Sequence, residues 1–136
     1  MFVDASAIIA ILTREPEAEA LTDVLEEARS PITSAVAIFE AVLGICRKRQ
    51  ASVEEGAQDV REFLGAAGIH TVPITETEAE AALAAFSRYG KGRGHPARLN
   101  LGDCFAYAMA QTHRTTLLFK RDDFAKTDIR PAARPP

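Results

Sequence analysis

The chain has 136 residues, 47% of them apolar and 26% charged, so it is long enough to bury one core and too apolar to be disordered. It contains no apolar run near the roughly 20 residues that cross a bilayer and no basic leader before an apolar stretch, which predicts a cytoplasmic protein without a membrane segment or signal peptide. The net charge of −3 does not by itself favour nucleic-acid binding. The basic residues gather in three stretches, however, so the sign of the net charge does not decide whether the protein binds RNA.

Short apolar runs alternate with helical patterns along the chain. Strands are predicted at residues 1–3, 31–33, 69–74, 116–119 and 127–129. Helices are predicted over 5–12, 16–28, 34–48, 52–65 or 52–68, 75–89 and 101–113, with a glycine-rich loop over 90–96. The pattern predicts an α/β fold with three α/β/α layers around a central parallel sheet of short strands, in one domain over 1–130 with a flexible tail over 131–136.

Four acidic residues stand where such a fold gathers ligands, near the carboxyl ends of its strands. Asp4 ends the first strand and Asp122 follows the strand at 116–119, so two parallel strands would bring both carboxylates to one edge of the sheet. Asp103 lies in the first turn of the helix before that strand. Glu40 lies at the rim of the apolar face of its helix, where a merely solubilising charge is poorly placed.

Converging carboxylates repel one another unless a cation binds between them. Mg²⁺ and Mn²⁺ prefer oxygen ligands, typically one or two carboxylates with water and substrate phosphate. Such a metal can generate hydroxide and stabilise the charge that develops on a phosphate during an in-line displacement. The acidic set therefore points to metal-assisted phosphate chemistry.

Two of the acids also have an ordinary structural explanation. Taken alone, Asp4 is explained at least as well by a role as the N-cap of the helix that begins at Ala5 as by metal binding. Asp103 forms a capping pattern with Asn100, and the helix dipole favours an acid in a first turn. Only the set, brought together by the fold, indicates a site.

The other two acids differ in how easily structure alone explains them. Asp122 or the neighbouring Asp123 is a common turn residue. Glu40 is harder to explain, although an ion pair with Arg47 or Lys48 is an alternative.

Four segments of the sequence contain the candidate acids together with the residues around them. They are 2–7 (FVDASA), 33–34 followed by Glu40, 95–107 (HPARLNLGDCFAY) and 117–124 (LLFKRDDF). The third is the most specific, because its order of small, polar and acidic residues is unusual for a helix start. On these segments the chain resembles PIN domains, and in particular VapC-type toxins, over nearly its whole length.

The resemblance implies which residues form the site. The family's acidic catalytic and metal-binding set maps onto Asp4, Glu40, Asp103 and Asp122. The metal ligands among them would be Asp4, Asp103 and Asp122. Ser6 maps onto a small hydroxyl residue near the metal, and Asn100 supports Asp103 as its helix cap. Many relatives have glycine in place of Arg121, which leaves open whether Asp122 or Asp123 faces the metal; we favour Asp122.

The resemblance also implies the activity and the partners. It implies an endoribonuclease that cleaves structured RNA, often transfer RNA, with Mg²⁺ or Mn²⁺ as cofactor. It implies a homodimer and a cognate VapB-like antitoxin that lays a helix and an arginine-bearing tail into the active-site groove, so that toxin and antitoxin form a hetero-oligomer. Arg93, His95 and Arg98 are candidate RNA phosphate contacts. The apolar group at 8–12 fits either the antitoxin groove or the core.

Two other classes of function fit parts of the pattern. A catalytically silent module that keeps the fold for protein contact is compatible with the sequence, although the intact acidic set favours catalysis. A Mg²⁺-binding phosphoacceptor domain with Lys120 after its last strand needs an acceptor aspartate at a central strand end, which neither Thr33 nor residues 72–73 supply. The scattered histidines indicate no zinc site.

Overall fold

The computed structural model describes residues 1–120 and 122–132; Arg121, whose identity bears on the last acidic turn, and the tail residues 133–136 lie outside the described residues. In the described part, one parallel sheet has the order β3-β2-β1-β4, with β1 (Phe2–Val3), β2 (Ile32–Thr33), β3 (His70–Thr71) and β4 (Leu117–Leu118). The helices are α1 (Ala5–Leu12), α2 (Ala18–Glu26), α3 (Ala35–Arg49), α4 (Val53–Ala67), α5 (Glu76–Tyr89), α6 (Leu101–Thr112) and the short 3₁₀ helix η1 (Asp122–Lys126).

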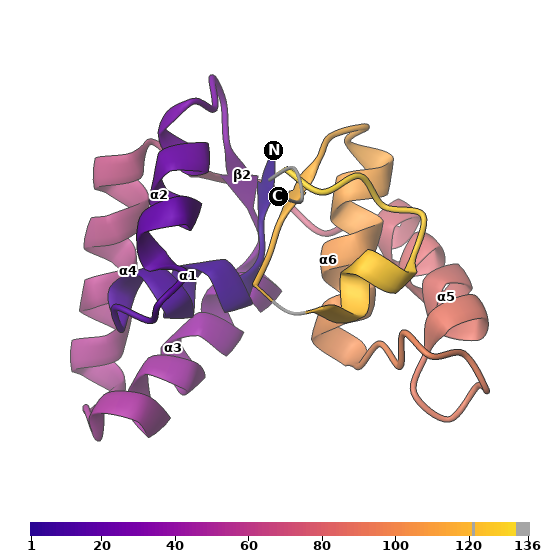
Figure 1. Cartoon of the computed structure of the whole chain (residues 1–136), viewed down its shortest axis with the longest axis horizontal. Coiled ribbons are helices and arrows are strands. Elements are labelled where there is room, and N and C mark those ends of the chain that lie inside the picture. Colours follow the sequence, from indigo (N-terminus) through magenta and orange to yellow (C-terminus); the bar gives the residue numbers. More distant parts are fainter. Residues whose placement is uncertain (121, 133–136) are drawn as a thin grey trace.

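The sheet lies between two groups of helices, α1 to α4 on one side and α5, α6 and η1 on the other (Figure 1). This arrangement confirms the predicted α/β fold with three layers and a central parallel sheet of short strands. None of the helices within the described ranges is long and apolar enough to cross a membrane.

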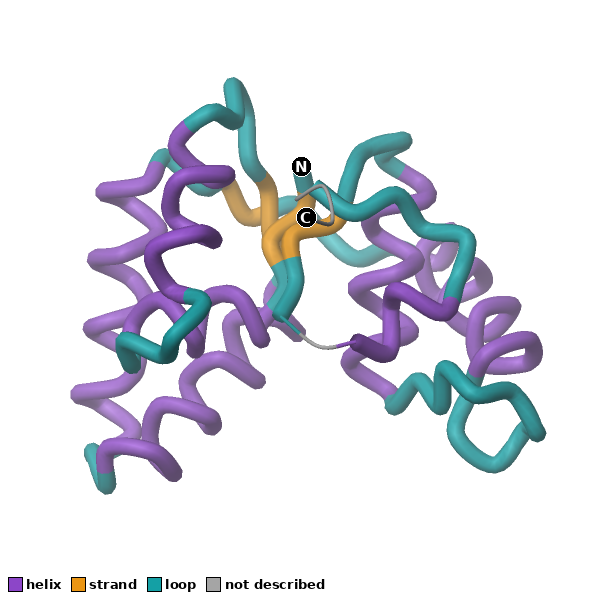
Figure 2. Tube along the Cα trace, in the orientation of Figure 1, coloured by secondary structure: helices purple, strands orange, loops and turns teal. Residues whose placement is uncertain are grey.

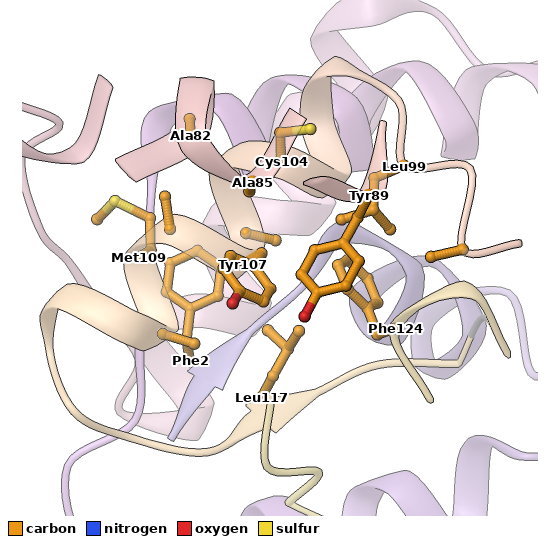
Figure 3. Close-up of a cluster of buried hydrophobic side chains, with 14 of the residues drawn as sticks. Phe2, Ala82, Ala85, Tyr89, Leu99, Cys104, Tyr107, Met109, Leu117 and Phe124 are labelled. Carbon is orange, nitrogen blue, oxygen red and sulfur yellow. The ribbon is translucent and has the colours of Figure 1, made fainter. Parts of the chain in front are cut away.

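The adjacent strands β1 and β4 supply both cores, because successive residues of a strand point to opposite faces of the sheet. Phe2 and Leu117, paired in register, pack with α5, α6 and Phe124 (Figure 3). Val3 and Leu118, the next pair in register, pack with α1 to α4. Strands β1 and β4 are therefore buried on both faces, as the continuous apolar runs of a parallel sheet predict.

The order of the strands reverses between β1 and β4. From β1 the chain moves outward to β2 and β3, and it then returns to form β4 on the other side of β1. Figure 2 shows the short strands gathered between the two groups of helices. In open parallel sheets, a ligand crevice usually lies outside the carboxyl ends of the strands at such a reversal. Asp4 stands at this point, since its backbone N–H donates to the carbonyl of Leu118 at 3.0 Å.

The predicted strand at 127–129 is wrong, because this segment forms a turn. Thr127 Oγ1 donates to the carbonyl of Phe124 at 2.7 Å and accepts from the backbone N–H of Ile129 at 3.3 Å. The chain pairs with the sheet slightly later: the N–H of Leu117 donates to the carbonyl of Arg130, and the N–H of Ala132 donates to the carbonyl of Leu117. The first residues assigned to the tail, 131–132, thus lie alongside β4.

We expect the buried face of β1 to carry much of the stability of the fold. Val3 is fully buried, whereas Val53 at the start of α4 is 61% exposed. Val3→Ala should lower the free energy of unfolding by roughly 2–3 kcal/mol, through lost apolar burial and the cavity left behind. The matched change Val53→Ala should alter it by less than about 0.5 kcal/mol. Urea unfolding followed by circular dichroism measures both, and equal effects would contradict this account of the core.

Candidate active site

Asp4 is held at the carboxyl end of β1 as the N-cap of α1. Its Oδ2 accepts from the backbone N–H of Ser6 at 3.0 Å and from the Ser6 hydroxyl at 2.5 Å. The Ser6 hydroxyl in turn accepts from the backbone N–H of Lys120, just beyond β4, at 3.0 Å. Asp4 is only 4% exposed, and the positive end of α1 favours its negative charge. The capping explanation is thus confirmed, and the same contacts orient the carboxylate at the sheet edge.

Glu40 extends from α3 to the first turn of α6. A Cβ atom built at Gly102 would lie 2.1 to 2.3 Å from the carboxylate atoms of Glu40, so the carboxylate occupies the space that any larger residue would fill. Gly102 directly precedes Asp103, and Glu40 is therefore placed beside the second buried aspartate. Lys48, considered above as a partner for Glu40, pairs with Glu15 instead.

Asp103 forms a reciprocal capping box with Asn100 at the start of α6. The backbone N–H of Asp103 donates to Asn100 Oδ1 at 2.9 Å, and the backbone N–H of Asn100 donates to Asp103 Oδ2 at 3.1 Å. Asp103 is 4% exposed. Burial, and then the charge of Asp103, raise the pKa of the Cys104 thiol to about 11, so this thiol stays protonated and is unsuited to act as a nucleophile.

Asp122 and Asp123 both lie in η1, where their environments differ. Asp122 is exposed and Asp123 is half-buried. The helix is anchored by Phe124, which is fully buried and packs against Phe119 with ring centroids 5.1 Å apart. The preference for Asp122 as the fourth acid stays a prediction.

The donor chemistry of the site suits a hard divalent cation. Asp4, Glu40 and Asp103 are carried to the same edge of the sheet by β1, α3 and α6, and their oxygens are the ligands that Mg²⁺ and Mn²⁺ prefer. Among residues 1–120 and 122–132, no three His, Cys, Asp or Glu side chains are grouped closely enough to hold a metal ion. The oxygen donors of the site suit a cation that takes one or two carboxylates and completes its shell with water and phosphate, as Mg²⁺ commonly does.

The basic residues of the loop before α6 have different roles in the fold. Arg93 and Arg98 are exposed. His95 is half-buried: its ring packs edge-on against Tyr89 with centroids 4.8 Å apart, and its Nδ1 accepts from the backbone N–H of Ala97 at 3.0 Å. His95 thus shapes the loop, and the predicted contacts of this loop with RNA stay predictions.

Sequence reasoning missed an exposed apolar surface beside the acids. Leu101, the first residue of α6, is 70% exposed and borders two grooves. The groove between α3 and α6 is lined by Ala35, Val36, Phe39, Glu40, Leu43, Asn100, Leu101 and Gly102. The groove between α5 and α6 is lined by Ala79, Ala82, Leu83, Phe86, Leu101, Cys104 and Phe105.

A signal for this surface was present in the spacing of the apolar residues. Phe39 and Leu43 are four residues apart on α3, Leu83 and Phe86 are three apart on α5, and all four are more than 40% exposed. Each pair therefore forms an apolar strip outside the core. The group at 8–12, by contrast, packs into the core on the α1 side of the sheet.

Comparisons with known proteins identify the family of the chain. A profile of the PIN domain family matches residues 1–130. The ribonuclease VapC42 of Mycobacterium tuberculosis is 40% identical over 97% of this chain and 98% of its own length. A VapC ribonuclease of Rhizobium meliloti is 40% identical over 94% of this chain and 98% of its own length.

Two solved structures share the fold. Mycobacterium tuberculosis VapC20, described as a toxin that cleaves the sarcin–ricin loop, superposes with a TM-score of 0.75 at 16% identity over 98% of both chains. A chain of a toxin–antitoxin complex from Klebsiella pneumoniae gives a TM-score of 0.66 at 22% identity over 91% of this chain and 89% of its own length. Together with the profile match and the 40% identical relatives, these findings show that the chain belongs to the PIN domain family, in its group of VapC ribonucleases.

Proposed function

We propose that this chain is the toxin of a toxin–antitoxin pair and acts in the cytoplasm as an endoribonuclease that cleaves structured RNA with bound Mg²⁺ or Mn²⁺. The observation that carries the proposal is the placing of Asp4, Glu40 and Asp103 at the carboxyl edge of the sheet, where the strand order reverses. The ribonuclease activity of the similar VapC proteins supports it. Transfer RNA is one substrate class that we propose to test.

The residues of the chain prepare this site before RNA binds. A bound divalent cation would supply activated water and positive charge for the phosphate chemistry. Ser6 and the start of α1 hold the Asp4 carboxylate, while the backbone N–H of Asn100 holds that of Asp103. Because helix caps fix both carboxylates, little reorganisation accompanies the reaction. Asp4 and Asp103 are buried, which would strengthen their electrostatic effect on a bound cation.

We propose that the two grooves that Leu101 borders bind the two protein partners. We assign the groove between α3 and α6 to the apolar face of a VapB-like antitoxin helix, because it is lined by Glu40 and lies beside acids that attract a basic side chain. We assign the groove between α5 and α6 to a second copy of the chain in a homodimer. Toxin and antitoxin would then assemble as a hetero-oligomer.

Asp4→Asn and Asp103→Asn are expected to lower metal-dependent RNA cleavage by more than about 100-fold, because an amide replaces an anionic ligand. Asparagine is itself a good N-cap, so Asp4→Asn should leave the fold intact. The measurement is end-mapping of total cellular RNA after incubation of antitoxin-free protein with Mg²⁺, Mn²⁺ or EDTA. Glu54→Gln, on the exposed first turn of α4, is the control and should cut normally.

The same assay separates Asp122 from Asp123. We expect Asp122→Asn to lose more activity than Asp123→Asn. Cleavage that survives in EDTA and in both buried-aspartate variants would contradict the metal-dependent mechanism. Absence of cleavage with every metal and RNA, together with tight antitoxin binding, would favour the silent binding module.

Gly102→Ala tests Glu40 separately from the stability of the fold. The added methyl group would displace the Glu40 carboxylate, so cleavage should fall by about 10- to 100-fold, as with Glu40→Gln. Gly65→Ala on α4 is the matched control, since nothing lies within 4 Å of the added Cβ there. Alanine favours a helix over glycine by about 1 kcal/mol, so neither variant should unfold more easily in urea. Full activity of Gly102→Ala would remove Glu40 from the mechanism.

Leu83→Glu is expected to convert a dimer into a monomer, because a buried unpaired charge in the groove between α5 and α6 opposes association. Phe39→Glu should leave the dimer intact and weaken antitoxin binding instead. Size-exclusion chromatography with light scattering measures the first effect, and calorimetric titration with antitoxin the second. A monomeric parent chain, or a dimer that tolerates Leu83→Glu, would refute the assignment of this groove.

A further inference from the structure

A single carboxylate outside the acidic set joins three separate segments of the chain. Glu15, in the connection between α1 and α2, accepts through Oε1 from Lys120 Nζ at 2.6 Å and from Lys48 Nζ. Lys48 lies in the last turn of α3, and Lys120 lies just beyond β4. The Glu15 side chain is 14% exposed, less than half the exposure of either lysine side chain.

The charges of this cluster are balanced within the protein. Hydrogen bonds from Lys120, and then from Lys48, hold the pKa of Glu15 below its usual value, so it is a carboxylate at neutral pH. Glu17 adds a second carboxylate, 3.8 Å from the ammonium of Lys120. Two lysines thus face two glutamates, and the charges of these four residues balance. The arrangement is suited to holding chain segments together.

Lys120 is fixed at both its side chain and its backbone. While its ammonium binds Glu15, its backbone N–H donates to Ser6 Oγ at 3.0 Å. A hydroxyl has one proton to donate, and Ser6 donates it to Asp4 Oδ2 at 2.5 Å. A continuous chain of contacts therefore runs from Glu15 through Lys120 and Ser6 to the first acid of the site.

We propose that Glu15 is a positioning residue of the active site: by holding Lys120, it keeps the Lys120 amide on Ser6 and so keeps the Asp4 carboxylate oriented. The inference rests on the proposed function for its effect on catalysis, but the contacts themselves exist without RNA or metal. Partly exposed ion pairs contribute little to global stability, so the effect should appear in activity more than in unfolding.

The first experiment uses neither RNA nor metal. Amide hydrogen exchange, followed residue by residue by NMR, reports whether the Lys120 amide stays bonded to Ser6. In Glu15→Gln, protection of this amide should fall by about tenfold as the segment opens locally. Asp59→Asn is the matched control: it breaks the exposed Arg49–Asp59 pair between α3 and α4 and should leave the Lys120 amide unchanged. Unchanged protection in Glu15→Gln overturns the proposal, whether or not the protein cuts RNA.

The second experiment tests the path to Asp4 through a double-mutant cycle. Glu15→Gln and Ser6→Ala should each lower kcat by about tenfold and leave KM for RNA nearly unchanged. A tenfold loss is the lower end of the range expected when a residue that supports a metal site indirectly is replaced. If Glu15 acts through Ser6, the double variant should be no slower than Ser6→Ala alone. Lys120→Arg, which keeps the charge, should retain most activity, whereas Lys120→Met should match Glu15→Gln.

Other outcomes overturn the proposal. Multiplicative losses in the double variant would show that Glu15 and Ser6 act independently. A raised KM in Lys120→Met with a lowered KM in Glu15→Gln would show that Lys120 contacts RNA and that Glu15 merely competes for it. An inactive parent chain would instead contradict the proposed ribonuclease function and leave the exchange experiment to decide the role of Glu15.

Discussion

The parallel pairing of β1 with β4 is the contact on which the rest of the molecule depends. Two registered pairs, Phe2 with Leu117 and Val3 with Leu118, send one side chain from each strand into each core. Because the pairing is parallel, both strands end at the same edge of the sheet. Asp4 and the segment that leads to η1 therefore begin side by side. The hydrophobic pairing that stabilises the two layers of helices also determines where the acids lie.

Helix capping performs two tasks at this edge. Asp4 caps α1 and Asp103 belongs to the capping box of α6, so each carboxylate satisfies backbone donors that a helix start leaves unpaired. The same hydrogen bonds fix the direction of each side chain. A capping role and a role in metal binding are therefore compatible, since a cap oriented before substrate binds is what a preorganised site requires.

Contacts between distant segments refine the position of these groups. Gly102 provides the space in which the Glu40 carboxylate rests beside Asp103. On the other side of Asp4, Lys120 connects Ser6 to Glu15 and, through it, to the end of α3. The acids at the sheet edge are thus supported from α6 on one side and from the connection between α1 and α2 on the other.

The sequence by itself determined the features that depend on near neighbours: the alternation of strands and helices, the helix caps, the candidate acids and the family. It could not identify the space at Gly102 or the turn that replaces the strand expected at 127–129, and the spacing of the apolar residues on α3 and α5 did not say which of them stay exposed. These features depend on which faces meet after folding. The Glu15 contacts, for example, join residues 33 and 105 positions apart, and local periodicity carries no information about such pairs.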